Sequence, residues 1–157
     1  MPIKLNRTQK ASSNLSQEWK RQSKLLLDTE DISEFRDAVV WCGKGGNVLR
    51  TLEKKFVQEF SEFLFNNKNE INNGNFKLSS LQNFGKKRPL SWASKIIHIM
   101  NPKKYPIIYD GNIRKVLGIK TIKQYEKRLI EERKLSKKMN DNDLYKYDSD
   151  IWASQSK

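Results

Sequence analysis

The chain has very few of the residues that build disulfides and zinc sites. Its 157 residues include one cysteine, Cys42, and one histidine, His98. A single cysteine cannot form an internal disulfide, and these two residues cannot supply the four ligands of an ordinary zinc site. We therefore expect a protein of a reducing compartment that has no metal site and no other cofactor.

Long apolar runs are also missing. No stretch approaches the roughly 20 apolar residues of a membrane-spanning helix, and the N-terminus lacks the apolar segment of a signal peptide. The mean hydropathy is −0.81 and 31% of the residues are charged, so the core must be small and draw on the 7 Phe, 5 Tyr and 4 Trp. This length suits one domain. We expect a soluble, cytoplasmic monomer without a membrane partner.

Acidic residues are scarce relative to basic ones. The chain has 31 Lys and Arg against 18 Asp and Glu, a net charge of +13. Such a charge indicates a polyanionic partner, most often nucleic acid. The alternative is that a lysine-rich and asparagine-rich composition reflects an AT-rich genome. The charge is uneven, however, because residues 114–138 hold ten basic and three acidic residues. This excess suits a phosphate backbone and predicts association with the nucleoid.

Apolar residues recur at helical spacing, and no alternation with a period of two persists anywhere, so the fold class is predicted as all-α. Residues 1–15 are polar and basic without periodicity, and we expect a flexible arm there or one that orders on contact. Residues 16–157 then form one compact helical domain. The expected helices cover residues 16–27, 32–42, 48–65, 76–84, 91–100, 112–117, 121–139 and 143–152, with 48–65 as the central core helix and 66–74 as a loop.

The helix over residues 91–100 carries a lysine, Lys95, inside an otherwise apolar segment. Pro102 and Pro106 break the chain after it, and Asp110 follows a short apolar run, 15 residues beyond Lys95. The turn between them can fold Asp110 back over Lys95, and a lysine that faces a carboxylate can do chemistry. The alternative role of Asp110 is to cap the helix over 112–117. For His98 the simplest role is a core residue.

A basic run, Lys86-Lys87-Arg88-Pro89, leads directly into this helix. Ser91 is placed to be the N-cap. Backbone N–H groups at such a helix start, next to three cationic side chains, form a phosphate-binding site. We therefore expect DNA to approach the molecule at this end of the helix.

These motifs resemble the helix-hairpin-helix DNA glycosylase superfamily, in particular the small bacterial and archaeal 8-oxoguanine-glycosylase-like proteins. The matching pieces are residues 91–95, 105–110, 112–117 and 148–152, although Ser91 and Ala93 stand where the family's hairpin usually has glycines. The resemblance implies a trimmed helical bundle in which Lys95 is the nucleophile and Asp110 its partner. It implies DNA contacts by Lys86, Lys87, Arg88, Ser91, Trp92, Ser94, Arg114 and Lys115, and a base pocket with Trp152, Asp148 and His98. For Trp92 and Trp152, core packing is an equally good alternative.

The expected function is that of a DNA glycosylase with AP lyase activity. It would act on duplex DNA whose damaged, 8-oxoguanine-like or modified base is flipped into a pocket. A neutral lysine amine can displace the base and leave a Schiff base that permits strand scission. Three alternatives stay open: a non-catalytic helical DNA-binding protein, a glycosylase of a hypermodified phage base in antiviral defence, and a buried Lys95–Asp110 ion pair that only joins two helices.

Overall fold

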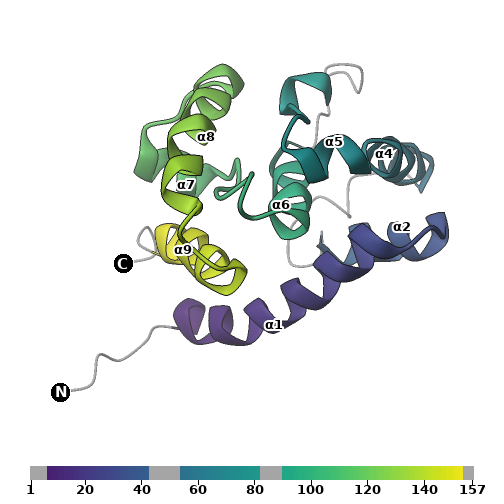
Figure 1. The fold of residues 1–157 in the computed structure, drawn as a ribbon, viewed down its shortest axis with the longest axis horizontal. Helices are drawn as coiled ribbons and strands as arrows, with labels where there is room; N and C mark the ends of the chain where they lie inside the picture. Colours follow the sequence, from purple (N-terminus) through teal and green to yellow (C-terminus); the bar gives the residue numbers. More distant parts are fainter. Residues whose placement is uncertain (1–6, 43–53, 82–89, 154–157) are drawn as a thin grey trace.

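A computed structural model describes residues 7–42, 54–81 and 90–153, and all structural statements concern these residues. Within them the chain forms eight α-helices and no strand, which confirms the predicted all-α fold class. None of the described helices combines the length and the apolar character that crossing a bilayer requires. The helices are α1 (Arg7–Asp28), α2 (Ile32–Cys42), α4 (Lys54–Asn66), α5 (Lys68–Asn73), α6 (Leu90–Met100), α7 (Gly111–Leu117), α8 (Ile122–Ser136) and α9 (Asp141–Ala153) (Figure 1).

The helix at the centre of the fold is α6. Figure 1 shows it between a group formed by α4 and α5 and a group formed by α7, α8 and α9, while the long helix α1 runs below α9 and α6 towards α2. Contacts of α1 with α9, α6 and α2 agree with this view. Every residue of α6 from Trp92 to Met100 is buried except Lys95. A helix surrounded on most sides must be apolar on most sides, and this one is.

The prediction that residues 48–65 form the central helix is therefore wrong. The described part of this segment, α4, buries Phe60, Ser61 and Leu64, and its other aromatic residues are only partly buried. Its single apolar stripe packs mainly on α2, and its opposite face is polar. A stripe of this kind marks a helix at the edge of a core. Residues 48–53 lie outside the described part of the chain.

Several helix boundaries differ from the predicted ones. Helix α1 begins at Arg7 instead of after Ser16, so that residues 7–15 of the expected arm are helical. This stretch contains neither glycine nor proline, and nothing in it stops a helix. Helix α5 lies in the expected loop and ends at Gly74, whose φ of 79° is left-handed. In place of a helix over 76–84, the described part has a short 3₁₀ turn at residues 78–81.

Helix α8 has the predicted position but a different inner face. Its N-cap, Thr121, forms a capping box with Gln124. The buried residues are Tyr125, Leu129, Glu132 and Ser136, while two residues predicted to face inward, Ile130 and Leu135, are 60% and 64% exposed. The inner face follows the helical spacing of 125, 129, 132 and 136. Its polar members have partners inside the protein: Glu132 accepts from Arg128 and Tyr147, and Ser136 donates to the carbonyl of Lys103. A hydrophobicity pattern alone does not show this.

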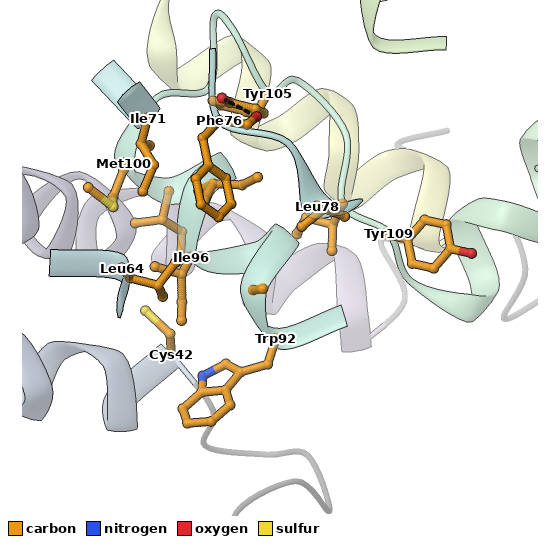
Figure 2. Close-up of a cluster of buried hydrophobic side chains, with 14 of the residues drawn as sticks. Cys42, Leu64, Ile71, Phe76, Leu78, Trp92, Ile96, Met100, Tyr105 and Tyr109 are labelled. Carbon is orange, nitrogen blue, oxygen red and sulfur yellow. Dashed lines mark hydrogen bonds between the residues drawn. The ribbon is translucent and has the colours of Figure 1, made fainter. Parts of the chain in front are cut away.

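The core is rich in aromatic and aliphatic side chains from α1, α2, α4 and α6 and from the chain on both sides of α6 (Figure 2). Tyr105 is 1% exposed and donates a hydrogen bond from its hydroxyl group to the carbonyl of Phe76 at 2.7 Å. The segment after α6 was expected to cross the surface, and only Lys103 and Lys104 are exposed there. The buried side chain of Tyr105 holds this segment against the core instead.

Candidate active site

Lys95 is the half-buried position of an otherwise buried segment. Its ammonium nitrogen lies 5.8 Å from the centre of the Trp19 ring, which α1 places against α6. Burial lowers the pKa of Lys95, and Cys42, Asp148 and Asp110 oppose that shift. A lowered pKa increases the neutral fraction of the amine, which is the form that can attack carbon.

Asp110 caps α7, as one of the two sequence interpretations predicted. Its backbone is extended (φ −108°, ψ 149°), and its Oδ1 accepts a hydrogen bond from the N–H of Asn112 at 2.8 Å. The second oxygen has no hydrogen-bond partner among the described residues. It is therefore free to interact with a charge or a proton near Lys95. Capping and chemistry are compatible here, because they use different oxygens.

The segment that leads to Asp110 is fastened to three helices. The N–H of Tyr109 donates to Oγ of Ser94 at 2.8 Å, and the N–H of Ile108 donates to Oδ1 of Asp148 on α9 at 2.8 Å. From α8 the hydroxyl group of Tyr125 donates to the carbonyl of Ile107 at 2.7 Å. Residues 107, 108 and 109 are thus each hydrogen-bonded to a different helix, which fixes the position of Asp110 relative to α6.

Asp148 brings a second carboxyl group to Lys95. It is 2% exposed, and burial raises its pKa to about 8. The N–H of Ile108 and the charge of Lys95 lower this pKa, whereas Asp110 raises it. Asp148 is thus mostly neutral at pH 7. The resemblance placed it in a base pocket; the contact that the structure gives it is with the backbone next to Asp110.

Cys42 was not expected near the site. It is 1% exposed on α2, and burial raises its pKa to about 12, while Lys95 lowers it. The thiol is therefore protonated at neutral pH and brings no charge to the amine. In Figure 2 it lies near Trp92 at one end of the core cluster. Nothing in the sequence connects Cys42 with a lysine 53 residues away, because the link depends on the packing of α2 against α6.

The structure argues against a buried ion pair between Lys95 and Asp110. Within the described part of the chain the ion pairs are Arg21–Glu18 and Arg128–Glu132, and Lys95 takes part in neither. The two carboxyl groups therefore raise the pKa of Lys95 through their charge, without forming an ion pair with the amine. A purely structural pair joining two helices would need that contact.

Two residues expected to touch DNA lie in the core. Trp92 is 3% exposed, and its Nε1 donates to the carbonyl of Val39 at 3.0 Å. Ser94 is fully buried and donates from Oγ to the carbonyl of Ser91 at 2.9 Å. Neither side chain has a surface that DNA could reach, so both assignments are corrected.

Ser91 itself is exposed but is not the N-cap, because α6 begins at Leu90. Leu90, the first described residue of α6, packs partly against the core. Lys115 is exposed on α7. Arg114 places its guanidinium 4.4 Å from the ring centre of Tyr109 and donates to the carbonyl of Lys120 at 2.8 Å, so it closes the end of α7. The side chains of Lys86, Lys87, Arg88 and Trp152 lie outside the described part.

His98 also belongs to the core and not to a pocket. It is fully buried, and its Nδ1–H donates to the carbonyl of Tyr105 at 2.6 Å. The rings of Trp19 and Tyr145 meet its ring edge-on at 5.7 and 5.5 Å. Burial lowers the pKa of His98 to about 4. Its visible role is to hold the segment after α6, which agrees with the simpler of the two sequence interpretations.

Two cavities of about 520 and 530 Å³ lie elsewhere. One is lined by residues of α5 and the segment after it, and the other by residues of α1 and α2; neither is lined by Lys95, Asp110 or Asp148. The described residues include no group of three or more His, Cys, Asp or Glu side chains placed to hold a metal ion.

Comparisons of the chain with protein-family models, with curated proteins and with solved structures find no match.

Proposed function

We propose that this protein is a DNA glycosylase with AP lyase activity, which excises a damaged, 8-oxoguanine-like or modified base from duplex DNA. The observation that carries the proposal is Lys95: a half-buried amine with a lowered pKa, near two carboxyl groups and without an ion pair to either. The resemblance of the surrounding motifs to helix-hairpin-helix DNA glycosylases supports the same assignment and the same type of helical bundle.

The reaction uses the lysine and one carboxylate in complementary ways. A base inside the duplex is out of reach, so its nucleotide must first be flipped out of the stack. The neutral amine of Lys95 then forms a bond to the anomeric carbon, and the N-glycosidic bond breaks with its electron pair going to the base. Asp110 stabilises the positive charge that develops on the sugar and accepts the proton that the amine loses.

Strand cleavage follows from the covalent intermediate. Opening of the sugar ring converts the amine adduct into a protonated Schiff base. This group acidifies the neighbouring carbon, which loses a proton to the solvent, and the 3′ phosphate leaves with the electron pair of its C–O bond by β-elimination. Hydrolysis of the Schiff base then frees Lys95. The amine is needed at both stages, which makes Lys95 the residue on which the proposal depends.

The surface charge supports a nucleic-acid partner. Exposed lysines on α7 and α8 and between them, Lys115, Lys120, Lys123, Lys127 and Lys134, take part in no ion pair within the described residues. The acidic residues of α8 are partly used inside the protein, since Glu126 accepts from the N–H of Ser79 and Glu132 accepts from Arg128 and from the hydroxyl group of Tyr147. Basic residues thus outnumber acidic ones on this surface, as contacts with phosphates require.

Borohydride trapping tests the proposal. The wild type is incubated with duplexes that carry an abasic site, 8-oxoguanine or a hypermodified base, and reduction converts any Schiff base into a stable adduct. Lys95→Gln is compared with Lys24→Gln, which removes the same charge from an exposed position on α1. We expect adducts with the wild type and the control and none with Lys95→Gln.

The other outcomes are equally informative. Salt-sensitive binding of duplex DNA without an adduct on any substrate would favour a non-catalytic DNA-binding protein. An adduct confined to the hypermodified base would favour a defence enzyme. If Lys95→Gln is folded by circular dichroism yet still forms the adduct, another amine is the nucleophile and the assignment of Lys95 is wrong.

A further inference from the structure

The backbone just before Asp110 depends on a side chain from the far end of the chain. The N–H of Ile108 donates to Oδ1 of Asp148, and the two residues are 40 positions apart. Asp148 belongs to α9, which packs against α1 and α7, and the hydroxyl group of Tyr145 on the same helix donates to the carbonyl of Ile99 on α6 at 2.9 Å. One face of α9 therefore contacts both the helix that carries Lys95 and the segment that carries Asp110.

We propose that Asp148 is a positioning residue of the reaction: its carboxyl group holds the backbone before Asp110 on α9, and its charge state acts on Lys95. This inference rests on the proposed function, and it adds a role for α9 that neither of the two catalytic residues provides. Asp148 acts through the backbone and through its charge state, and it need not touch the substrate.

The choice of a carboxyl group is the informative part of the geometry. An asparagine at this position could accept the same hydrogen bond and would bring no charge, whereas a buried aspartate is costly to ionise. The charged and titratable groups that face Asp148 are Lys95 on α6, Asp110 at the start of α7, Tyr125 on α8 and Tyr147 on α9 itself. An ionised Asp148 would be repelled by Asp110 and would hold Lys95 in its ammonium form.

The carboxyl group thus makes the site sensitive to pH in a defined direction. Because the pKa of Asp148 is raised to about 8, the group is neutral at pH 7 and ionises as the solution becomes alkaline. Ionisation raises the pKa of Lys95 at the same time, since each charge affects the other. Attack by the amine should then gain less from alkaline pH than the titration of an isolated lysine predicts.

The test is single-turnover cleavage of an abasic duplex between pH 5.5 and 9.5, with the full chain as wild type, Asp148→Asn and Asp148→Ala. Asp150→Asn and Asp150→Ala are matched controls, because Asp150 is exposed on the same helix. At pH 7 we expect Asp148→Ala to lose about 10- to 100-fold in rate with unchanged affinity for the duplex, because a displaced reacting group costs a factor of this order. At alkaline pH the rate of the wild type should level off or fall. Asp148→Asn should keep most of the rate at pH 7, and its rate should continue to rise at alkaline pH.

A measurement without DNA separates this inference from the proposed function. The pH dependence of reductive methylation of Lys95 by formaldehyde and cyanoborohydride, followed by mass spectrometry of the peptide, reports the titration of the amine directly. We expect Asp148→Asn to make Lys95 more reactive above pH 8 and Asp150→Asn to leave it unchanged. If the wild type never cleaves or traps DNA but this shift is found, the proposed function fails and the coupling of the two residues stands.

The inference is overturned if Lys95 is methylated identically in Asp148→Asn and the wild type, or if folded Asp148→Ala cleaves at the wild-type rate. Should Asp148→Ala fail to fold by circular dichroism, Asp148→Asn decides, because it preserves the hydrogen-bond acceptor and removes only the ability to ionise. Equal losses of rate and affinity in a folded Asp148→Ala would point to a general structural role and would also overturn it.

Discussion

The hydrogen bond from the N–H of Tyr109 to Oγ of Ser94, 2.8 Å long, joins the immediate neighbours of the two proposed catalytic residues. Ser94 precedes Lys95 on α6, and Tyr109 precedes Asp110 at the start of α7. Ser94 also donates to the carbonyl of Ser91, so its hydroxyl group is used in both directions. The relation between lysine and carboxylate is therefore set one residue away from each of them.

Ser94→Ala should weaken both the fold and the proposed reaction. The change leaves the N–H of Tyr109 buried without its acceptor, which costs about 1–3 kcal/mol in the free energy of unfolding. Urea denaturation of Ser94→Ala measures this cost, and Ser91→Ala is the control because its side chain is exposed on the same helix. Equal stability of the two variants would show that the hydrogen bond does not hold the segment. Borohydride trapping by the folded variant should be slower than that of the wild type.

The sequence was sufficient to predict the features of the site that depend on local chemistry. Asp110 caps α7 and Gly118 ends it with a φ of 69°. Both roles follow from local preferences, because aspartate is a favoured N-cap residue and glycine readily adopts the left-handed conformation that ends many helices. Lys95 stood out because a lysine is rare inside so apolar a helix. These signals lie within a few residues of the atoms that they concern.

The features that the sequence could not predict depend on packing between distant segments. The contacts of Asp148 with Ile108 and of Trp92 with Val39 span 40 and 53 residues and leave no periodic pattern. The face of α8 was assigned wrongly for a related reason: Ile130 is apolar but exposed, and a buried Glu132 is stabilised by Arg128 and Tyr147, which only the structure brings to it.

His98 should make the fold less stable in mild acid. Its pKa is lowered from 6.5 to about 4 in the folded protein, so below pH 6.5 the unfolded chain binds a proton that the folded chain does not. The stability associated with neutral His98 is present above pH 6.5 and is lost as the pH falls towards 4, with a ceiling of about 3 kcal/mol. Urea midpoints at pH 4.5, 5.5, 6.5 and 7.5 measure the slope. His98→Gln should reduce the slope, and an unchanged slope would show that other groups cause it.

Asp148 should act on stability in the opposite direction. The folded carboxyl group stays protonated up to a pKa of about 8, whereas in the unfolded chain it ionises above 3.8. The folded state thus binds the extra proton, and stability from this group falls as the pH rises from about 4 to 8. Asp148→Asn does not titrate, so it should gain stability relative to the wild type across this range, whereas Asp150→Asn should follow the wild type. A constant difference between Asp148→Asn and the wild type at pH 5 and pH 8 would contradict the raised pKa.

The unpaired lysines of α8 should carry part of the affinity for DNA, and their position should matter more than the total charge. Each phosphate contact that is lost lowers the slope of log K against log salt concentration by about 0.9. Replacing Lys123, Lys127 and Lys134 by Gln should therefore reduce both affinity and slope, as measured by fluorescence anisotropy on a duplex between 50 and 200 mM salt. Replacing Lys20, Lys24 and Lys55 by Gln removes the same charge from exposed positions on α1 and α4. If both triple variants lose the same affinity, the affinity depends only on the net charge of +13, and α8 is not part of the binding surface.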